Sequence, residues 1–246
     1  MSLRLRFRRL LQSAGYDLHR LPYGSMTFRD LEVDLPHLVK MENPVVIDVG
    51  ANRGQTIDMI RRAFSNAKIT AFEPNPDLLP ALSRDYREVA TVEGVAVGSA
   101  VGRISFHVSE NPELSSVLAA ARSPENIFAA TPVRKVVSVP VTTIDSYMQE
   151  KNIKHINLLK SDTQGFDLEV LRGASQALDR GAVDTILVET NFISLYEQQS
   201  TFGEIEQFLK IKNYRLTAFY EIARPDYFVS WATTCFQRAS SSAGVS

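Results

Sequence analysis

The chain has 246 residues, 44% of them hydrophobic, and a formal net charge of -1 from 27 basic and 28 acidic side chains. This length suits one α/β domain with additions, and the balanced charge gives no indication of a nucleic-acid partner. The single cysteine, Cys235, excludes an internal disulfide framework and a cysteine-rich zinc site. No apolar run is long enough to cross a bilayer or to form a signal-peptide core, so we expect a cytoplasmic protein without stable membrane insertion.

The first 43 residues predict a flanking segment in front of the domain. Residues 1–12 contain four arginines, no acid, and apolar residues on one helical face. This pattern suits a helix that touches an anionic membrane surface, or one that packs on the domain with its arginines in solvent. We favour the second interpretation because so short a segment binds a membrane weakly by itself. The rest predicts an irregular lead-in with a short helix over residues 35–41.

Residues 45–56, VVIDVGANRGQT, are the most informative stretch of the chain. The branched apolar residues 45–47 predict a strand buried on both faces, as in a parallel sheet. Gly50 and Gly54 permit a tight turn, and apolar residues at helical spacing from Ile57 onward predict a helix that starts near Gly54. Strand, turn and helix N-terminus together predict a cofactor site at the carboxyl edge of the sheet.

The spacing of this turn, D-x-G-x-x-x-G, differs from the dinucleotide-binding fingerprint G-x-G-x-x-G. Asn52 stands where a middle glycine would let a pyrophosphate approach the backbone. The turn therefore favours a ligand without a pyrophosphate, such as S-adenosylmethionine. A nicotinamide-dependent oxidoreductase is the alternative enzyme, because it would share the sheet, and an ordinary strand-to-helix turn is the structural alternative.

A second strand over residues 68–72 ends at Glu73, about twenty-five residues after Asp48. This spacing is close to that of the acid that binds ribose hydroxyls in nucleotide-binding α/β sheets. A carboxylate can accept hydrogen bonds from both hydroxyls, although Glu73 could instead cap the next helix or pair with a surface base. Pro74 stops the strand, and Asn75 can cap the helix that follows.

A third strand over residues 89–93 leads to small residues around Ala96, which leave room for a flat ring such as adenine. Residues 103–108 and 133–141 predict an antiparallel β-hairpin insertion added to the core sheet. The loop between them, residues 110–132, is long enough to be a lid over a substrate, and a plain surface connection is the equal alternative.

Asp162 and Glu189 each follow a further apolar strand, and residues 213–220 and 227–237 predict a final strand pair. Strands joined by right-handed helical crossovers run parallel, so these two acids and those of the first two strands share one edge of the sheet. A single acid at a strand end could cap a helix. Four acids beside a glycine turn predict a bowl for a polar ligand.

Three motifs carry a family resemblance: IDVGANRGQ at residues 47–55, FEPNP at 72–76 and LKSDTQGFDLEVLRGA at 159–174. Over residues 44–238, the predicted domain, the chain resembles the FkbM family of S-adenosylmethionine-dependent methyltransferases; residues 239–246 are expected to form a flexible tail. The resemblance implies an α/β, Rossmann-like class I methyltransferase fold. Its sheet would be mostly parallel and seven-stranded, with helices on both faces and the last strand antiparallel.

The resemblance implies S-adenosyl-L-methionine as the cofactor and methylation of a hydroxyl on a sugar, glycan or natural product. Members often carry glutamate where this chain has Gln164, which can hydrogen-bond but cannot act as a base. The expected partner is a small-molecule or glycan acceptor, and the sequence leaves its identity and the oligomeric state open. The candidate cofactor-binding residues are Asp48, Gly50, Ala51, Asn52, Gly54, Gln55, Thr56, Glu73, Pro74, Asn75, Ala96 and Asp162.

Asp162 and Glu189 are the candidate catalytic residues, because a hydroxyl acceptor must lose its proton during the in-line attack on the methyl group. Asp162 is the first candidate for the base or for a residue that orients the acceptor. His155 precedes its strand and is predicted to face the opposite edge. A divalent metal held by both acids is an alternative without a supporting motif, so no metal is expected. A non-catalytic binding module is a further alternative, against which the intact turn argues.

Overall fold

A computed structural model describes residues 7, 10–15, 26–225 and 227–239. Of the predicted basic segment over residues 1–12, the structure describes residues 7 and 10–12, which are helical, and of the predicted tail over residues 239–246 it describes residue 239. No helix in the described part of the chain combines the length and the apolar character that a membrane span requires.

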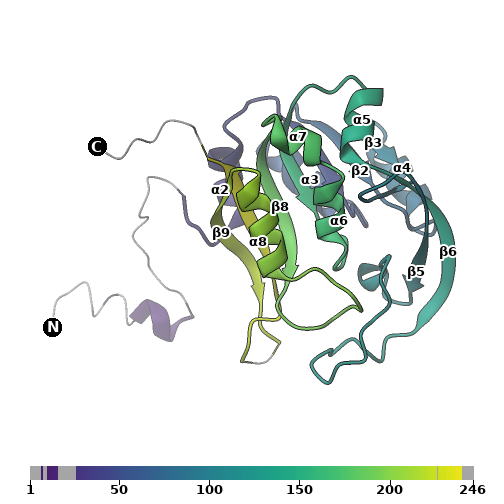
Figure 1. The fold of residues 1–246 in the computed structure, drawn as a ribbon. Helices are drawn as coiled ribbons and strands as arrows, with labels where there is room; N and C mark the ends of the chain where they lie inside the picture. Colours follow the sequence, from purple (N-terminus) through teal and green to yellow (C-terminus); the bar gives the residue numbers. More distant parts are fainter. Residues whose placement is uncertain (1–6, 8–9, 16–25, 226, 240–246) are drawn as a thin grey trace.

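A seven-stranded sheet forms the centre of the molecule (Figure 1). Strand β10 pairs antiparallel with both neighbours, and the other pairs are parallel, so the last strand runs against the other six. This confirms the predicted α/β, Rossmann-like architecture, a mostly parallel seven-stranded sheet with its last strand antiparallel. In sheet order the strands are β3 (Ala90–Glu93), β2 (Lys68–Phe72), β1 (Val45–Val49), β7 (Ile156–Ser161), β8 (Val183–Asn191), β10 (Trp231–Arg238) and β9 (Tyr214–Ala223).

Helices cover both faces of this sheet, as predicted. Successive strand residues point to opposite faces, so the fully buried Val46 and Ile47 belong to two different hydrophobic clusters. The cluster on the Val46 side includes α2 (Leu31–Val39), α3 (Gln55–Ala63) and α4 (Leu79–Tyr86). The cluster on the Ile47 side includes α5 (Ile144–Glu150), α6 (Asp167–Arg172), α7 (Ser175–Asp179) and α8 (Phe202–Ile211).

The predicted hairpin insertion is antiparallel, but it does not join the core sheet. Strands β5 (Gly102–Ser109) and β6 (Val133–Thr142) pair with each other, and β6 pairs with the short β4 (Ala96–Val97) in a separate three-stranded sheet. The prediction was wrong here because β4 pairs in parallel with the end of β6, and the three strands bury a small hydrophobic cluster of their own.

Helix α2 ties the segment before the domain to the sheet. Asp34 in this helix is fully buried, and its carboxylate accepts hydrogen bonds from the backbone of Thr27 (2.5 Å) and Phe28 (2.6 Å). It also accepts from the Tyr220 hydroxyl on β9 (3.0 Å). The helix begins earlier than predicted because the Asp30 side chain caps it.

We expect Asp34→Ala to lower the free energy of unfolding by about 2–4 kcal/mol, because it leaves several buried donors without an acceptor. Urea unfolding measures the change. Asp30→Ala, which removes only the exposed cap of the same helix, is the matched control and should cost about 1 kcal/mol. Equal losses in the two variants would contradict a special role for Asp34.

Candidate functional site

A cavity of about 400 Å³ opens at the carboxyl edge of the large sheet. Of the four acids predicted to share this edge, Glu73, Asp162 and Glu189 line the cavity, and Asp48 lies fully buried behind it. Their proximity follows from the strand register, in which Asp48 on β1 is paired with Lys160 on β7. Ser161 is likewise paired with Val188 on β8, so the residues that follow these two, Asp162 and Glu189, are also neighbours.

The glycine turn between β1 and α3 packs directly against the end of β7. Gly50 has φ +85°, and a Cβ atom on it would lie 1.9 Å from the carbonyl oxygen of Asp162. The backbone of Asp162 therefore leaves no space for a side chain at Gly50. This constraint adds to the one predicted from the sequence, that a glycine here leaves room for a ligand. Gly54 lies outside the cavity lining and caps α3, where a Cβ atom would meet the Tyr86 ring at 2.3 Å.

Glu73 joins the turn after β1 to the turn after β2. Its carboxylate accepts from the backbone N–H of Asn52 at 2.7 Å and from that of Asn75 at 2.8 Å. Burial raises the pKa of Glu73 to about 7, against the effect of these hydrogen bonds, and the charges of Asp48 and Asp162 raise it further. Asn75 is buried outside the cavity lining, and its side chain accepts from the backbone of Asp77 in the turn before α4. The prediction that it caps this helix was wrong, because α4 begins at Leu79 without a side-chain cap.

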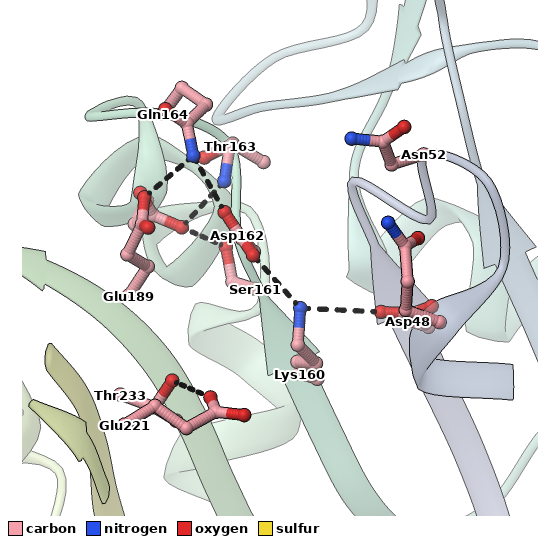
Figure 2. A network of polar contacts seen from close by, with 12 residues as sticks. Asp48, Asn52, Lys160, Ser161, Asp162, Thr163, Gln164, Glu189, Glu221 and Thr233 are labelled. Carbon is pink, nitrogen blue, oxygen red and sulfur yellow. Dashed lines mark hydrogen bonds and ion pairs between the residues drawn. The ribbon is translucent and has the colours of Figure 1, made fainter. Parts of the chain in front are cut away.

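Lys160 is the central residue of the site and was not singled out from the sequence. Its ammonium lies 3.3 Å from Asp162 Oδ2 and 3.8 Å from Asp48 Oδ1 (Figure 2). Burial lowers the pKa of Lys160, but Asp162 and Asp48 raise it by more, so the side chain stays protonated. The available signal was a lysine directly after Leu158 and Leu159 in a predicted buried strand, because a charge in a buried strand needs a partner.

Asp48 is a fully buried member of this network. Neither carboxylate oxygen has a hydrogen-bond partner among the described residues, and Lys160 is its ion-pair partner there. Burial raises its pKa to about 6, an effect that the Lys160 charge partly offsets. The structure therefore places Asp48 behind the cavity, where it faces Lys160.

Gln164 bridges the two candidate catalytic acids. Its Nε2 donates to Asp162 Oδ1 at 3.0 Å and to Glu189 Oε2 at 2.9 Å, while its Oε1 accepts from the Tyr196 hydroxyl at 2.6 Å (Figure 2). Gln164 has φ +56°, a left-handed conformation between β7 and α6. Tyr196 was not predicted, because its segment carries no motif.

The two acids hold their protons differently. Burial raises the pKa of Asp162, but the charge of Lys160 and the hydrogen bond from Gln164 lower it by more, so the net shift is downward. For Glu189, burial and the charge of Asp162 raise the pKa well above its ordinary value. The two shifts therefore run in opposite directions, and they favour the ionised form of Asp162 and the protonated form of Glu189.

Asp167, the first residue of α6, holds the loop that precedes this helix. Its carboxylate accepts from Ser161 Oγ at 2.5 Å and from the backbone of Thr163 at 3.1 Å. Asp162 is thus not needed to close the loop before α6. On the opposite edge of the sheet, His155 Nε2 lies 2.8 Å from Asp184 Oδ2, as its position before the strand predicted.

Most of the predicted set lines the cavity, together with several residues that no motif marked. The predicted lining residues are Gly50, Ala51, Asn52, Gln55, Thr56, Glu73, Pro74, Ala96, Asp162 and Glu189. The loop over residues 110–132, which includes η1 (Pro112–Leu114), forms one wall. The lining residues that were not predicted include Phe128 from this loop, Leu195, Glu221 and Trp231.

Comparison with known proteins identifies the family. The methyltransferase FkbM domain matches residues 48–216, and the chain belongs to this family. It is 27% identical over 213 residues to methyltransferase sdnD of Sordaria araneosa, with 76% of this chain and 79% of the relative covered. It is 24% identical to 2-O-methyltransferase NoeI of Sinorhizobium fredii (66% and 69% covered), and 31% identical to hexuronic acid methyltransferase AglP of Haloferax volcanii (60% and 56% covered).

The protein is therefore an S-adenosylmethionine-dependent methyltransferase, which decides against the nicotinamide-dependent oxidoreductase. The cavity fits this cofactor in size, since small-molecule pockets measure roughly 300–1,000 Å³. It also fits in chemistry, because Asn52 Oδ1 and Thr163 Oγ1 are buried without a hydrogen-bond partner among the described residues. Both residues line the cavity, so these oxygens are available to a polar ligand.

We expect Gly50→Ala to destabilise the protein by at least about 2 kcal/mol, because the added Cβ meets Asp162 and the left-handed conformation is strained. The same change should weaken binding of S-adenosylhomocysteine, measured by calorimetry. Gly102→Ala is the control, since a Cβ atom there meets open space. Normal stability and binding in Gly50→Ala would contradict the close packing of the turn.

The raised pKa of Glu73 predicts a pH dependence of stability. Because the folded-state value of about 7 exceeds the ordinary 4.5, the favourable contribution is complete below pH 4.5 and is lost as the pH rises through 7. The free energy of unfolding should fall over this window by an amount on the order of 3 kcal/mol from Glu73 alone. Glu73→Gln should flatten the slope, whereas Glu88→Gln at an exposed position should not.

Proposed function

We propose that this methyltransferase acts on a hydroxyl oxygen of a sugar or of another small polar acceptor. The observation that carries the proposal is the position of the Asp162 carboxylate, which lines the cavity next to the glycine turn, is held by Lys160 and Gln164, and is linked to Glu189 through the Gln164 amide. The names of two relatives, a 2-O-methyltransferase and a hexuronic acid methyltransferase, support it.

The residues around the glycine turn would hold the cofactor. Bound there, S-adenosylmethionine supplies an electrophilic methyl group on a positively charged sulfur. The turn over residues 50–52 offers backbone atoms and the unpartnered Asn52 Oδ1. Glu73, which has two carboxylate oxygens at the cavity wall, is assigned to the ribose hydroxyls, and Ala96 leaves room for the adenine ring.

Asp162 would orient the acceptor hydroxyl and take its proton. A hydroxyl is a weak nucleophile, but its proton becomes strongly acidic as the oxygen forms its new bond, so a carboxylate of low pKa can accept it. Lys160 and Gln164 hold this carboxylate in place through its two oxygens. Glu189 shares the Gln164 amide with Asp162, and burial and the charge of Asp162 raise its pKa, which favours Asp162 over Glu189 as the proton acceptor.

Release of S-adenosylhomocysteine in the presence of a panel of neutral and acidic methyl pyranosides tests the activity. With an active acceptor, we expect Asp162→Asn to slow the single-turnover rate by roughly 10²–10⁴-fold, the usual contribution of a general base. The affinity for S-adenosylhomocysteine should change far less. Asp184→Asn, which alters an acid at the opposite edge, is the control. An Asp162→Asn protein with full activity would overturn the role of Asp162, and cofactor binding without turnover on any acceptor would indicate a binding module.

A further inference from the structure

The polar residues at the carboxyl edge form a row that continues beyond the catalytic pair. Glu189 on β8 is paired with Thr233 on β10, and Thr233 Oγ1 donates to Glu221 Oε2 at 2.6 Å. Figure 2 shows Glu221 and Thr233 beside the network of Glu189 and Lys160, with no contact drawn between the two groups. The row therefore runs from the cofactor turn, across the catalytic acids, to a separate carboxylate on β9.

A local irregularity gives Glu221 its position. The register between β9 and β10 shifts between Trp231 and Thr233, because Trp231 is paired with Ala223 and Thr233 with Tyr220. Strand β9 thus has one extra residue at this point, and Glu221 has φ +49°. Bulges of this kind redirect side chains next to functional sites. Glu221 lines the cavity although it lies at an edge strand.

Two aromatic rings form a wall at the same end of the cavity. Trp231 at the start of β10 and Phe128 from the loop over residues 110–132 have ring centroids 5.8 Å apart, at 51° to each other. Both residues are partly exposed and both line the cavity, so their rings are accessible to a ligand there. The wall combines apolar surface with the hydrogen-bonding carboxylate of Glu221.

We propose that this end of the cavity is the acceptor subsite and that it takes an uncharged pyranose ring. This inference rests on the proposed function and names its substrate class. The C–H face of a pyranose is apolar and packs on an aromatic wall such as Trp231 and Phe128, while a carboxylate such as Glu221 accepts hydrogen bonds from ring hydroxyls. A hydroxyl on the inner side of that ring is then directed toward Asp162.

The charges of the cavity select against an acidic sugar. Glu73, Asp162 and Glu221 line it, and among the described residues Lys160 is the cation in the lining. Lys160 already lies beside two carboxylates, so its single positive charge cannot also compensate a third negative charge. A uronic acid would bring its negative charge toward these acids without a partner, which is unfavourable in a partly buried site.

The chain offers a direct probe of this subsite, because Trp231 is its single tryptophan. Calorimetry with S-adenosylhomocysteine first tests cofactor binding, which the proposed function requires. The full-length protein saturated with this compound is then titrated with neutral methyl pyranosides and with the corresponding methyl uronates, and the fluorescence of Trp231 is followed. We expect saturable changes with at least one neutral pyranoside and at least roughly 10-fold weaker binding of its uronate.

Glu221→Gln should weaken the neutral pyranoside roughly 10-fold, with its effect on KM rather than on kcat, because a charged acceptor of hydrogen bonds is lost. Glu88→Gln, at an exposed position, is the control. Trp231→Phe removes the fluorescent reporter, so its binding is measured by calorimetry, and it should bind the cofactor normally. Cofactor binding together with no response to any neutral pyranoside, or with tighter binding of the uronate, would overturn the subsite. Failure of cofactor binding itself would overturn the proposed function instead.

Discussion

The buried ammonium of Lys160 is the interaction on which the rest of the site depends. It lies between Asp48 and Asp162, so one cation compensates two carboxylates from neighbouring strands. Without a partner, each of these charges would be strongly unfavourable in the sheet. The ion pair lowers the pKa of Asp162, and the charge of Asp162 raises the pKa of the nearby Glu189. These opposite shifts are the basis on which we propose Asp162, and not Glu189, as the acceptor of a proton from the substrate.

The packing around Lys160 also divides the cavity into two sides. On one side, the turn after β1 is held by the hydrogen bonds of Glu73 and by contact between Gly50 and the backbone of Asp162. On the other side, the bulge of β9 and the start of β10 present Glu221 and Trp231. The same carboxyl edge therefore has a polar side, where we propose that the cofactor binds, and an aromatic wall, where we propose that the acceptor binds, with Asp162 between them.

Gln164 shows how a departure from the usual family motif can be compatible with the site. An amide has two N–H donors, and here they are shared between Asp162 and Glu189. A carboxylate at this position would place a third acid against the pair and would offer it no such donors. The left-handed backbone of Gln164 and the hydroxyl of Tyr196 hold the amide in this orientation.

The sequence by itself determined the strands, the glycine turn, the acids at one edge and the family. Buried strands, positive-φ glycines and strand-end acids each leave a pattern within a few neighbouring residues, so they can be recognised without the fold. Only the tertiary structure decided which side chains meet. It paired Lys160 with Asp48 and Asp162, moved β5 and β6 into a separate sheet, and brought Phe128, Glu221 and Trp231 to one wall. Strand order, register and burial set these contacts and the pKa values that follow from them, and all three depend on residues far apart in the chain.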